Sequence, residues 1–413
     1  MWKDGDQSLK TIRFENDIDM YEYLDQKLIS GSKITKTVGL SVILDDNLLL
    51  EVDSNIIKKE LLFPDYNDTF LNVIKKIKDY YNAKTDTLFG GKYNKVVILL
   101  LDGMGVNILN NNLNGNSFIR SLYLKKIHSI YPSTTAASTT SIKSGLSPIS
   151  SGWTGWENYF SEINRDVVLF TGNNYFTGEP TGVNGYKKMP YRMFYEDLIV
   201  KGYDIEPDFT KDSRSINDVL QMSLKMLEKN EKQIQYVYYT EPDGIMHKYG
   251  AYSNEAKIVL KEIDESVCKY ANKLSDDTLL IITSDHGHTD VLPINLYACK
   301  PILRLLRRNP ANDARCISFA VKEGKNKEFE LLFNSLFSNV YKLYKTTDAI
   351  ALGFFGKSGD YINPVIDDFL ADYVAVGISN YYFNYSNSDF VFKSHHAGIT
   401  KDEMLVPVCI YKK

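Results

Sequence analysis

Three continuous apolar runs, each ending at an aspartate, constrain the fold of this chain more than any other feature. The runs are NKVVILLLDGMG, QIQYVYYTEPDG and DTLLIITSDHGH, and their aspartates are Asp102, Asp243 and Asp285. Continuous apolar runs are typical of strands that are buried on both faces in a parallel sheet. Helical patterns at residues 215–230 and 254–274 alternate with these runs. The order predicts an α/β fold with a mainly parallel central sheet and helices on both faces.

The aspartates also stand where such a sheet binds its ligands, at the carboxyl ends of the strands. Carboxylates at three strand ends therefore predict a functional cluster. Carboxylates and imidazoles together suit zinc, with manganese and iron as competitors. Five of the six histidines lie beside these aspartates or in glycine-containing motifs, namely His247, His286, His288, His395 and His396.

Two motifs have the spacing of metal ligands. Asp243 and His247 are four residues apart, which places both on one face of a helical turn. A hydrogen-bonded surface pair has the same spacing, but the position after a buried strand favours ligation. Adjacent Asp285 and His286 both reach a metal only where the chain leaves strand geometry, which the following glycine permits. His288 could itself bind a metal ion, could hold a metal ligand in place, or could have no role in the site. We favour the second and third of these roles over the first.

A dense run of hydroxyl residues, IYPSTTAASTTSIKSGLSP, occupies residues 130–148. This pattern predicts a helix N-terminus with Ser and Thr caps. A helix N-terminus also binds anions, because its free backbone N–H groups point outward. A hydroxyl placed there beside a metal ion would lose its proton readily and become a nucleophile.

Five motifs, in order, resemble those of the alkaline phosphatase superfamily, and most closely the type I phosphodiesterase/nucleotide pyrophosphatase family. They are LLLDGMG, YPSTTAASTTSIKSGLSPISSGWTGW, EPDGIMHKYG, SDHGH and HHAGITKDEMLVPV. The resemblance implies an alkaline phosphatase-like fold and hydrolysis of a phosphodiester or nucleotide pyrophosphate. Phosphomonoesterase, phosphonate hydrolase and phosphotransferase activities are alternatives on the same scaffold. A metal-free binding protein is a further alternative, which the presence of all seven ligand positions disfavours.

When the family's roles are carried over motif by motif, the resemblance implies two divalent metal ions. These would be zinc ions, with manganese as the alternative. It further implies that Thr135 attacks phosphorus and forms a covalent threonine intermediate. Thr134 and His395 are alternatives one residue away from the assigned positions. The implied ligands are Asp102, Thr135, Asp285 and His286 for the first ion, and Asp243, His247 and His396 for the second.

The sequence departs from the family pattern just after the implied nucleophile. The family usually has an aromatic residue, a proline and an asparagine there, whereas residues 136–138 are Ala-Ala-Ser. The phosphoryl-binding role of the asparagine would fall to the Ser138 hydroxyl or to backbone N–H groups. The missing aromatic residue removes the usual platform for a base, which argues against a nucleotide substrate. Trp153, Trp156 and Tyr159 either line a different pocket or pack in the core.

The domain organisation follows from the same patterns. Residues 91–299 and 391–413 are expected to form the catalytic core. Residues 1–90, predicted as a strand pair and a helix, are expected to extend that core. Residues 300–390 are expected to form an inserted α+β cap subdomain, because CISFAVKEG and DYVAVGISNYYF have strand patterns and KEFELLFNSLFSNVYKLYK has a helical one.

Composition excludes several classes of function. A net charge of −4 does not fit a nucleic-acid-binding surface, so we expect a small-molecule phosphate ester as the partner. No run reaches the roughly 18 apolar residues of a membrane helix. The four cysteines form no CxxC pair and no signal peptide is visible, so we expect a cytoplasmic protein with reduced thiols. Nothing in the sequence indicates the oligomeric state.

Overall fold

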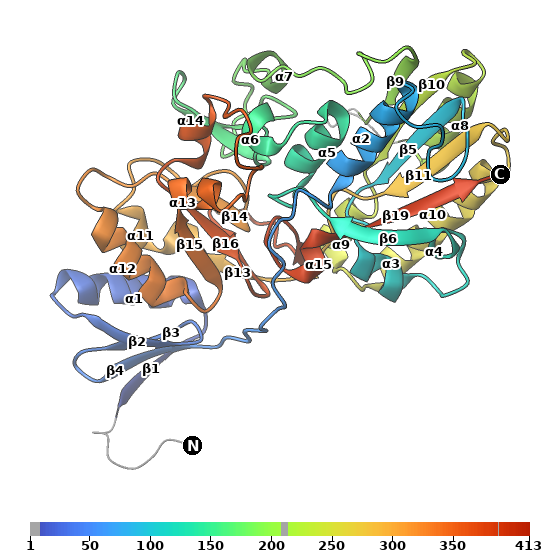
Figure 1. Cartoon of the computed structure of the whole chain (residues 1–413). Helices are drawn as coiled ribbons and strands as arrows, with labels where there is room; N and C mark the ends of the chain where they lie inside the picture. The colour runs from blue at the N-terminus through green and yellow to red at the C-terminus, as the bar shows by residue number, and fades with distance from the viewer. Residues whose placement is uncertain (1–8, 208–213, 387) are drawn as a thin grey trace.

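The computed structural model describes residues 9–207, 214–386 and 388–413, which form two lobes (Figure 1). One lobe is built on a six-stranded sheet. Its strand order is β6 (Tyr123–His128), β19 (Leu405–Lys412), β11 (Thr278–Thr283), β5 (Lys95–Leu101), β10 (Gln233–Tyr239) and β9 (Lys201–Ile205). The strands β11, β5, β10 and β9 pair in parallel, and β19 runs antiparallel to both of its neighbours. The predicted mainly parallel sheet is therefore confirmed.

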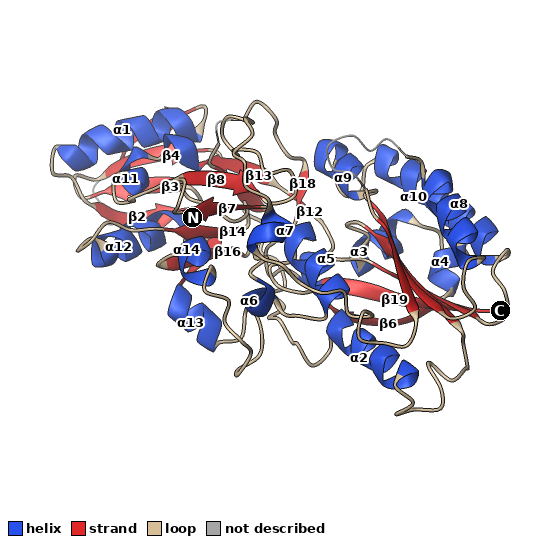
Figure 2. Cartoon of the chain, turned by 90° about the horizontal axis from the view of Figure 1, so that it is seen from above, coloured by secondary structure: helices blue, strands red, loops and turns tan. Residues whose placement is uncertain are grey.

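Helices cover both faces of this sheet, as Figure 2 shows. The side chains of β5 alternate between two apolar clusters because successive residues of a strand point to opposite faces. Val97, Leu99 and Leu101 pack on the side of α3 (Val106–Asn112), α8 (Ile216–Leu227) and α10 (Asn254–Ala271). The residues between them face α2 (Phe70–Tyr81) and α5 (Thr135–Ser144). Burial on both faces explains why the strand is apolar throughout.

The N-terminal segment forms a sheet of its own. Strands β1 (Lys10–Phe14), β4 (Leu48–Val52), β3 (Ser41–Leu44) and β2 (Ile34–Val38) pair in that order, with α1 (Asp17–Ile29) packed against them. Their apolar side chains join one cluster with the aromatic face of α12 (Asn326–Phe337). Residues 10–52 thus do not extend the six-stranded sheet as expected. From residues 1–90, α2 is the helix that packs on it.

The inserted region contains a three-stranded antiparallel sheet in the order β14 (Cys316–Phe319), β16 (Tyr373–Gly377) and β15 (Tyr341–Lys345). The stretch 327–345, expected to be one helix, is a helix only as far as Phe337. Its last five residues form β15 because they pair with β16. The expected domain boundaries remain a prediction.

The remaining elements are short. They are α4 (Phe118–Ser121), α6 (Pro148–Ser151), β7 (Glu157–Phe160), β8 (Arg165–Val168), α7 (Gly185–Lys188), α9 (Asp243–Tyr249), β12 (Thr289–Asp290), β13 (Leu292–Asn295), η1 (Leu296–Ala298), α11 (Lys300–Leu303), α13 (Thr346–Ala351), α14 (Ile366–Leu370), β17 (Tyr381–Asn384), β18 (Ser394–His395) and α15 (Lys401–Met404).

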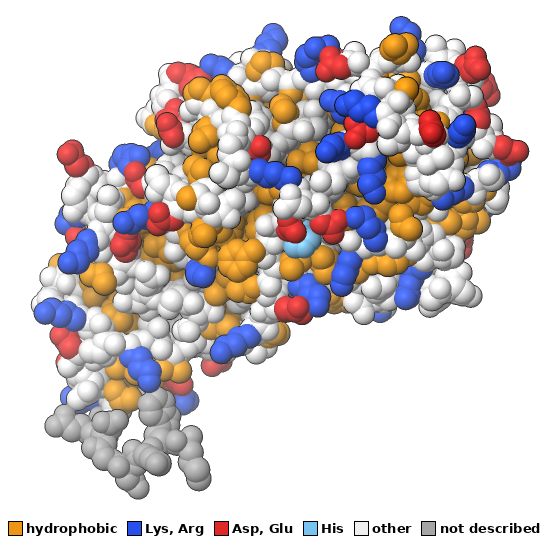
Figure 3. Space-filling view, in the orientation of Figure 1, with side chains coloured by type: hydrophobic (Ala, Val, Ile, Leu, Met, Phe, Trp, Pro, Cys, Tyr) orange, Lys and Arg blue, Asp and Glu red, His pale blue; other side chains and the backbone are white. Residues whose placement is uncertain are grey.

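The surface carries mixed charge. Basic and acidic side chains are interspersed over the face shown in Figure 3. Within the described part of the chain, no helix combines the length and the apolar character needed to cross a membrane. The location of the protein in the cell remains a prediction.

Candidate active site

The three strand-end aspartates meet at one edge of the six-stranded sheet. Asp102 directly follows β5, Asp243 begins α9 after β10, and Asp285 follows β11. Because β10 and β11 both pair with β5, their carboxyl ends are neighbours. Asp102 and Asp285 are buried, at 3% and 1% exposure. The fold therefore concentrates carboxylates where water is largely excluded.

Two glycines let the loops around this cluster pack backbone to backbone. A Cβ atom on Gly105 would lie 2.4 Å from the Cα atom of Gly287. A Cβ atom on Gly287 would lie 2.0 Å from the carbonyl oxygen of Asp402. Any larger residue would push apart the loops that carry the aspartates and histidines.

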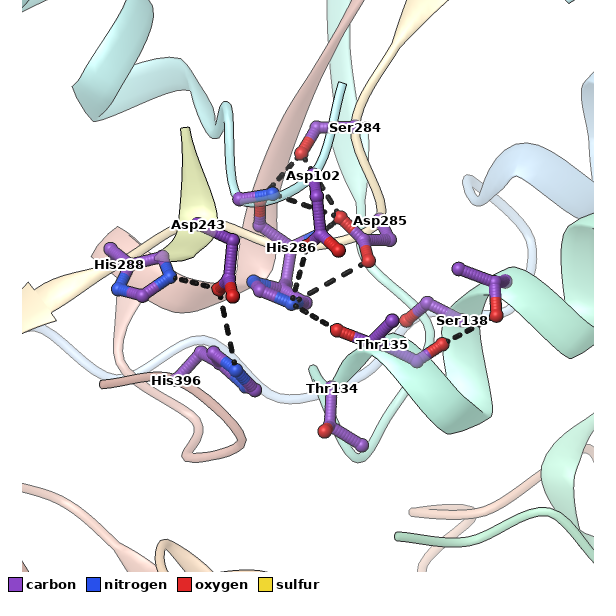
Figure 4. A network of polar contacts seen from close by, with 12 residues as sticks. Asp102, Thr134, Thr135, Ser138, Asp243, Ser284, Asp285, His286, His288 and His396 are labelled. Carbon is purple, nitrogen blue, oxygen red and sulfur yellow. Dashed lines mark hydrogen bonds and ion pairs between the residues drawn. The ribbon is translucent and has the colours of Figure 1, made fainter. Parts of the chain in front are cut away.

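His286 is the centre of the first group of site residues. Its Nε2 atom lies 3.3 Å from Asp102 Oδ1, 3.5 Å from Asp285 Oδ2 and 3.3 Å from Thr135 Oγ1 (Figure 4). Its Nδ1 atom lies 3.1 Å from the carbonyl oxygen of Gly287. A proton held on Nδ1 by that carbonyl would leave the Nε2 lone pair facing the carboxylates.

Asp243 is the centre of the second group. Its Oδ1 atom lies 2.6 Å from His288 Nε2, 3.3 Å from His247 Nε2 and 3.6 Å from His396 Nε2. The ring of His396 stacks on that of His286, with centroids 3.8 Å apart, so the two groups adjoin. Each group thus contains all the residues that the sequence assigned to it.

The histidines also differ in ways that the sequence did not show. His288 lies closer to Asp243 than either His247 or His396, although we expected a less direct role. Its Nδ1 atom is 3.0 Å from Ser394 Oγ. His395 accepts the backbone N–H of His396 at Nδ1 and packs on Phe392. Among the described ion pairs, His396 and not His395 is joined to Asp243.

The residues present fit divalent metal ions. Burial and the nearby carboxylates of Asp285 and Asp243 raise the pKa of Asp102. Burial and the surrounding histidines lower the pKa of His396. Asp102 Oδ1 and Asp285 Oδ2 are buried without a hydrogen-bond partner among the described atoms. Such a cluster is costly unless cations compensate it.

Ligand-type atoms gather in two sets whose members all lie within 4.8 Å of one another. One set is Asp102, Asp243 and His286, and the other is Asp243, His247, His288 and His396. Mixed carboxylate and imidazole donors suit zinc or manganese.

The threonines at the start of α5 point in different directions. Thr135 Oγ1 faces the first group, whereas Thr134 Oγ1 donates to Asp313 Oδ2 at 2.8 Å. Ser138 Oγ lies 3.4 Å from both Ser129 Oγ and the carbonyl oxygen of Ile130. The structure therefore brings Thr135 to the cluster but not the hydroxyl of Ser138.

A cavity of about 300 Å³ opens beside Thr135. Of the residues that line it, the sequence did not indicate Glu157, Tyr175, Asp313, Ala314, Tyr385 or Phe392, whereas Trp156 had been considered. Trp153 is instead fully buried, with Nε1 donating to the carbonyl oxygen of Met189. Tyr159 packs against Arg308. The cavity is lined by Thr135, Trp156, Glu157, Tyr175, Asp243, His247, Asp313, Ala314, Tyr385, Phe392, His395 and His396.

Comparison with known proteins identifies a family. The sequence model of the type I phosphodiesterase/nucleotide pyrophosphatase family matches residues 96–396, more than half of the chain. Ectonucleotide pyrophosphatase/phosphodiesterase family member 7 of Rattus norvegicus is 37% identical over 128 residues, 30% of this chain and 27% of the relative. Family member 1 of Homo sapiens is 29% identical over 184 residues, 40% of this chain and 20% of the relative. The matched segments thus span less than a third of the length of these curated relatives.

Solved structures share the fold. Murine ectonucleotide pyrophosphatase/phosphodiesterase 5, an inactive threonine-to-alanine variant in complex with AMP, has a TM-score of 0.57 at 15% identity. The likeness covers 78% of this chain and 88% of that one. Phosphonoacetate hydrolase from Sinorhizobium meliloti in complex with phosphonoformate has a TM-score of 0.56 at 14% identity, covering 79% and 92%. The alkaline phosphatase-like architecture predicted from the motifs is therefore confirmed.

Proposed function

The chain belongs to the type I phosphodiesterase/nucleotide pyrophosphatase family, and from this premise we propose that it is a metal-dependent hydrolase of phosphodiesters with Thr135 as its nucleophile. One observation carries the proposal. The Thr135 hydroxyl lies at the N-terminus of α5, 3.3 Å from His286 and on the wall of the cavity that holds the aspartate–histidine groups. A threonine-to-alanine variant of the murine neighbour is described as inactive.

Two divalent ions, zinc in first place, fit the two groups. Asp102, Asp285, His286 and the Thr135 oxygen would hold one ion, and Asp243, His247 and His396 would hold the other. When bound, the ions would supply positive charge that draws in the phosphate ester and stabilises the attacking and leaving oxygens. His288 would position Asp243 through their 2.6 Å contact.

Thr135 Oγ would attack phosphorus after its proton has passed to water. The new Oγ–P bond would form as the bond to the leaving oxygen breaks, and that oxygen would leave as an alcohol after protonation by water. Water would then cleave the threonine phosphoester and restore the hydroxyl. The N–H groups in the first turn of α5 would bind a phosphoryl oxygen, because they have no partner within the helix. These backbone N–H groups would thus bind the phosphoryl oxygen in place of the Ser138 hydroxyl, which does not face the cluster.

A panel of p-nitrophenyl monoesters and diesters tests the proposal. We expect diesters to be hydrolysed fastest, with about two metal ions bound per chain and zinc restoring activity after EDTA treatment. The phosphonoacetate hydrolase neighbour makes phosphonoacetate a necessary member of the panel. Activity in protein that contains no metal would contradict the mechanism. A preference for monoesters would indicate a phosphomonoesterase with the same fold, and a preference for phosphonoacetate would indicate a phosphonate hydrolase.

A further inference from the structure

Each of the two carboxylates in the first group has one oxygen occupied by a protein donor. Asp285 Oδ1 accepts the backbone N–H groups of Gly103 and His286, at 3.1 and 3.0 Å. Asp102 Oδ2 accepts the hydroxyl of Tyr238. The other two oxygens, Asp102 Oδ1 and Asp285 Oδ2, are buried without a hydrogen-bond partner among the described atoms. They lie 3.3 and 3.5 Å from His286 Nε2, so each aspartate offers one free oxygen to the same place (Figure 4).

The central sheet places Tyr238 beside Asp102. Strand β10 pairs with β5, and Tyr238 stands opposite Leu100, two residues before Asp102. The backbone N–H of Asp102 donates to the carbonyl oxygen of Tyr239 at 3.0 Å, which continues the pairing to the strand end. Tyr238 is 3% exposed. Two paired strands, which hold side chains more precisely than loops do, thus bring the hydroxyl to the carboxylate.

The number of oxygens that Asp102 offers to a metal ion matters for the nucleophile. A carboxylate binds a metal ion through one oxygen or through both. Zinc usually takes four ligands, and Asp102, Asp285 and His286 would supply three of them through one atom each. The fourth position would then be open for the Thr135 oxygen. If Asp102 turned and offered both oxygens, the second oxygen would occupy the position that Thr135 needs.

We propose that Tyr238 is a positioning residue that limits Asp102 to one metal-binding oxygen and so keeps a ligand position of the first ion open for Thr135. This inference rests on the proposed reaction at Thr135. The donated hydrogen bond fixes the orientation of the carboxylate and makes Oδ2 a poorer ligand. The choice of metal follows from the same contact. Manganese takes more oxygen ligands than zinc, so an Asp102 that binds through one oxygen favours zinc.

Tyr238→Phe removes the hydroxyl and keeps the ring. Tyr236→Phe is the matched control, because Tyr236 lies two residues earlier on β10 and its side chain belongs to the same apolar cluster. Tyr236 is 0% exposed, and its hydroxyl has no hydrogen-bond partner within the described part of the chain. The two variants therefore delete the same atom from the same face of one strand.

Metal competition tests the inference without requiring turnover. The full chain is stripped of metal, and the binding of zinc and of manganese is measured against a chromophoric chelator. We expect Tyr238→Phe to weaken zinc binding at one of the two sites by about 10–100-fold and manganese binding by less. Tyr236→Phe should bind both metals as the wild type does. Circular dichroism of the metal-free variants checks that the fold is retained.

Cobalt substitution shows whether the ligands of the ion have changed. Four-coordinate cobalt absorbs visible light much more strongly than six-coordinate cobalt, so coordination geometry can be followed in the spectrum. We expect the absorption per bound ion to fall in Tyr238→Phe and to stay unchanged in Tyr236→Phe. Equal weakening of zinc and manganese with an unchanged cobalt spectrum would show a merely structural role for Tyr238 and overturn the inference.

Kinetics separate this inference from the proposed reaction. With a p-nitrophenyl diester at saturating zinc, we expect Tyr238→Phe to lower kcat by about tenfold or more. KM should change little, because Tyr238 does not line the cavity beside Thr135. A changed zinc preference and cobalt spectrum in Tyr238→Phe, without cleavage of any ester by the wild type, would support the hold of Tyr238 on Asp102 and contradict the hydrolase. Cleavage by the wild type, with the same metal binding, spectrum and kcat in Tyr238→Phe, would support the hydrolase and contradict the inference.

Discussion

At the scale of single residues, Thr134 and Thr135 show how neighbouring identical side chains acquire different tasks. Thr135 Oγ1 faces His286, whereas Thr134 Oγ1 donates to Asp313. We expect Thr135→Ala to eliminate turnover while metal content stays near that of the wild type, because the metal groups keep their carboxylates and imidazoles. Thr135→Ser should retain part of the activity, since it keeps the oxygen but loses the methyl group that restricts the rotamer. Turnover numbers and metal analysis of the purified variants measure both effects.

Thr134→Ala is the matched control for this prediction. It removes a hydroxyl from the adjacent residue and should be much milder, because that hydroxyl points to Asp313 and not to the aspartate–histidine groups. A dead Thr134→Ala with an active Thr135→Ala would shift the nucleophile by one residue. Activity in both would mean that no threonine attacks phosphorus.

His247 provides the corresponding test of the metal groups. Its Nε2 atom faces Asp243 at 3.3 Å, and its Nδ1 atom lies 2.9 Å from the carbonyl oxygen of Ser394. We expect His247→Ala to lower the rate by several orders of magnitude and to lose about one metal ion per chain. Asp285→Ala should lower the rate similarly. Near-normal turnover with full metal content in either variant would contradict the assignment of that residue as a metal ligand. Circular dichroism of each variant checks that the fold is retained.

At the scale of elements, the loops that follow β5 and β11 must touch through their backbones. Gly287→Ala would place a methyl group 2.0 Å from the carbonyl oxygen of Asp402, so the loop that carries Asp285 and His286 must move. A displacement of about 1 Å can cost about a hundredfold in rate, and we expect a loss of that order. Steady-state kinetics with the best diester measures it.

Gly115→Ala is the control at this scale. A Cβ atom there would meet nothing within 4 Å. The unfolding free energy should therefore stay within about 0.5 kcal/mol of the wild-type value. The activity should be unchanged. Equal kinetics for Gly287→Ala and the wild type would show that the loop contact does not position the site.

At the scale of the whole molecule, one buried ion pair joins the inserted region to the six-stranded lobe. Arg315, just before β14, donates to both oxygens of Glu403 in α15 at 2.7 and 2.8 Å, and both side chains are fully buried. Glu403 also accepts the N–H of Gly398, two residues after His396. We expect Glu403→Gln to lower the unfolding free energy by about 3–5 kcal/mol, because it leaves the Arg315 charge uncompensated. Urea denaturation measures this.

The control variant is Glu328→Gln, which breaks an exposed pair with Lys325 on the same lobe. It should cost less than about 1 kcal/mol. A Glu403→Gln cost as small as that of the control would show that the buried pair does not stabilise the contact between lobes.

The same pair predicts a pH dependence. Burial alone would raise the pKa of Glu403, but the charge and hydrogen bonds of Arg315 lower it overall. A carboxyl group with a lowered pKa in the folded state stabilises the protein above the unfolded pKa of about 4.3 and loses that contribution as the pH falls through the folded value. The stability gap between wild type and Glu403→Gln should therefore shrink below pH of about 4. A gap that widens on acidification would contradict this assignment.

The sequence by itself determined the central sheet and the aspartates at its edge. Runs such as residues 95–101 are apolar at every position, and only a strand covered on both faces buries them all. The polar residue that ends each run then has to stand at the carboxyl end of a strand. Local spacing was also sufficient to place Asp243 with His247, and Asp285 with His286.

Only the tertiary structure decided the partners of segments that are distant in sequence. The apolar side chains of strands β1 to β4 fit any apolar surface, and the aromatic face of α12 provided one. Residues 341–345 became a strand because β16 was available for pairing. Glu157, Asp313 and Tyr385 come from three separate segments, and no local spacing relates them. Contacts of this kind depend on chain topology, because their energy exists only once the lobes have packed together.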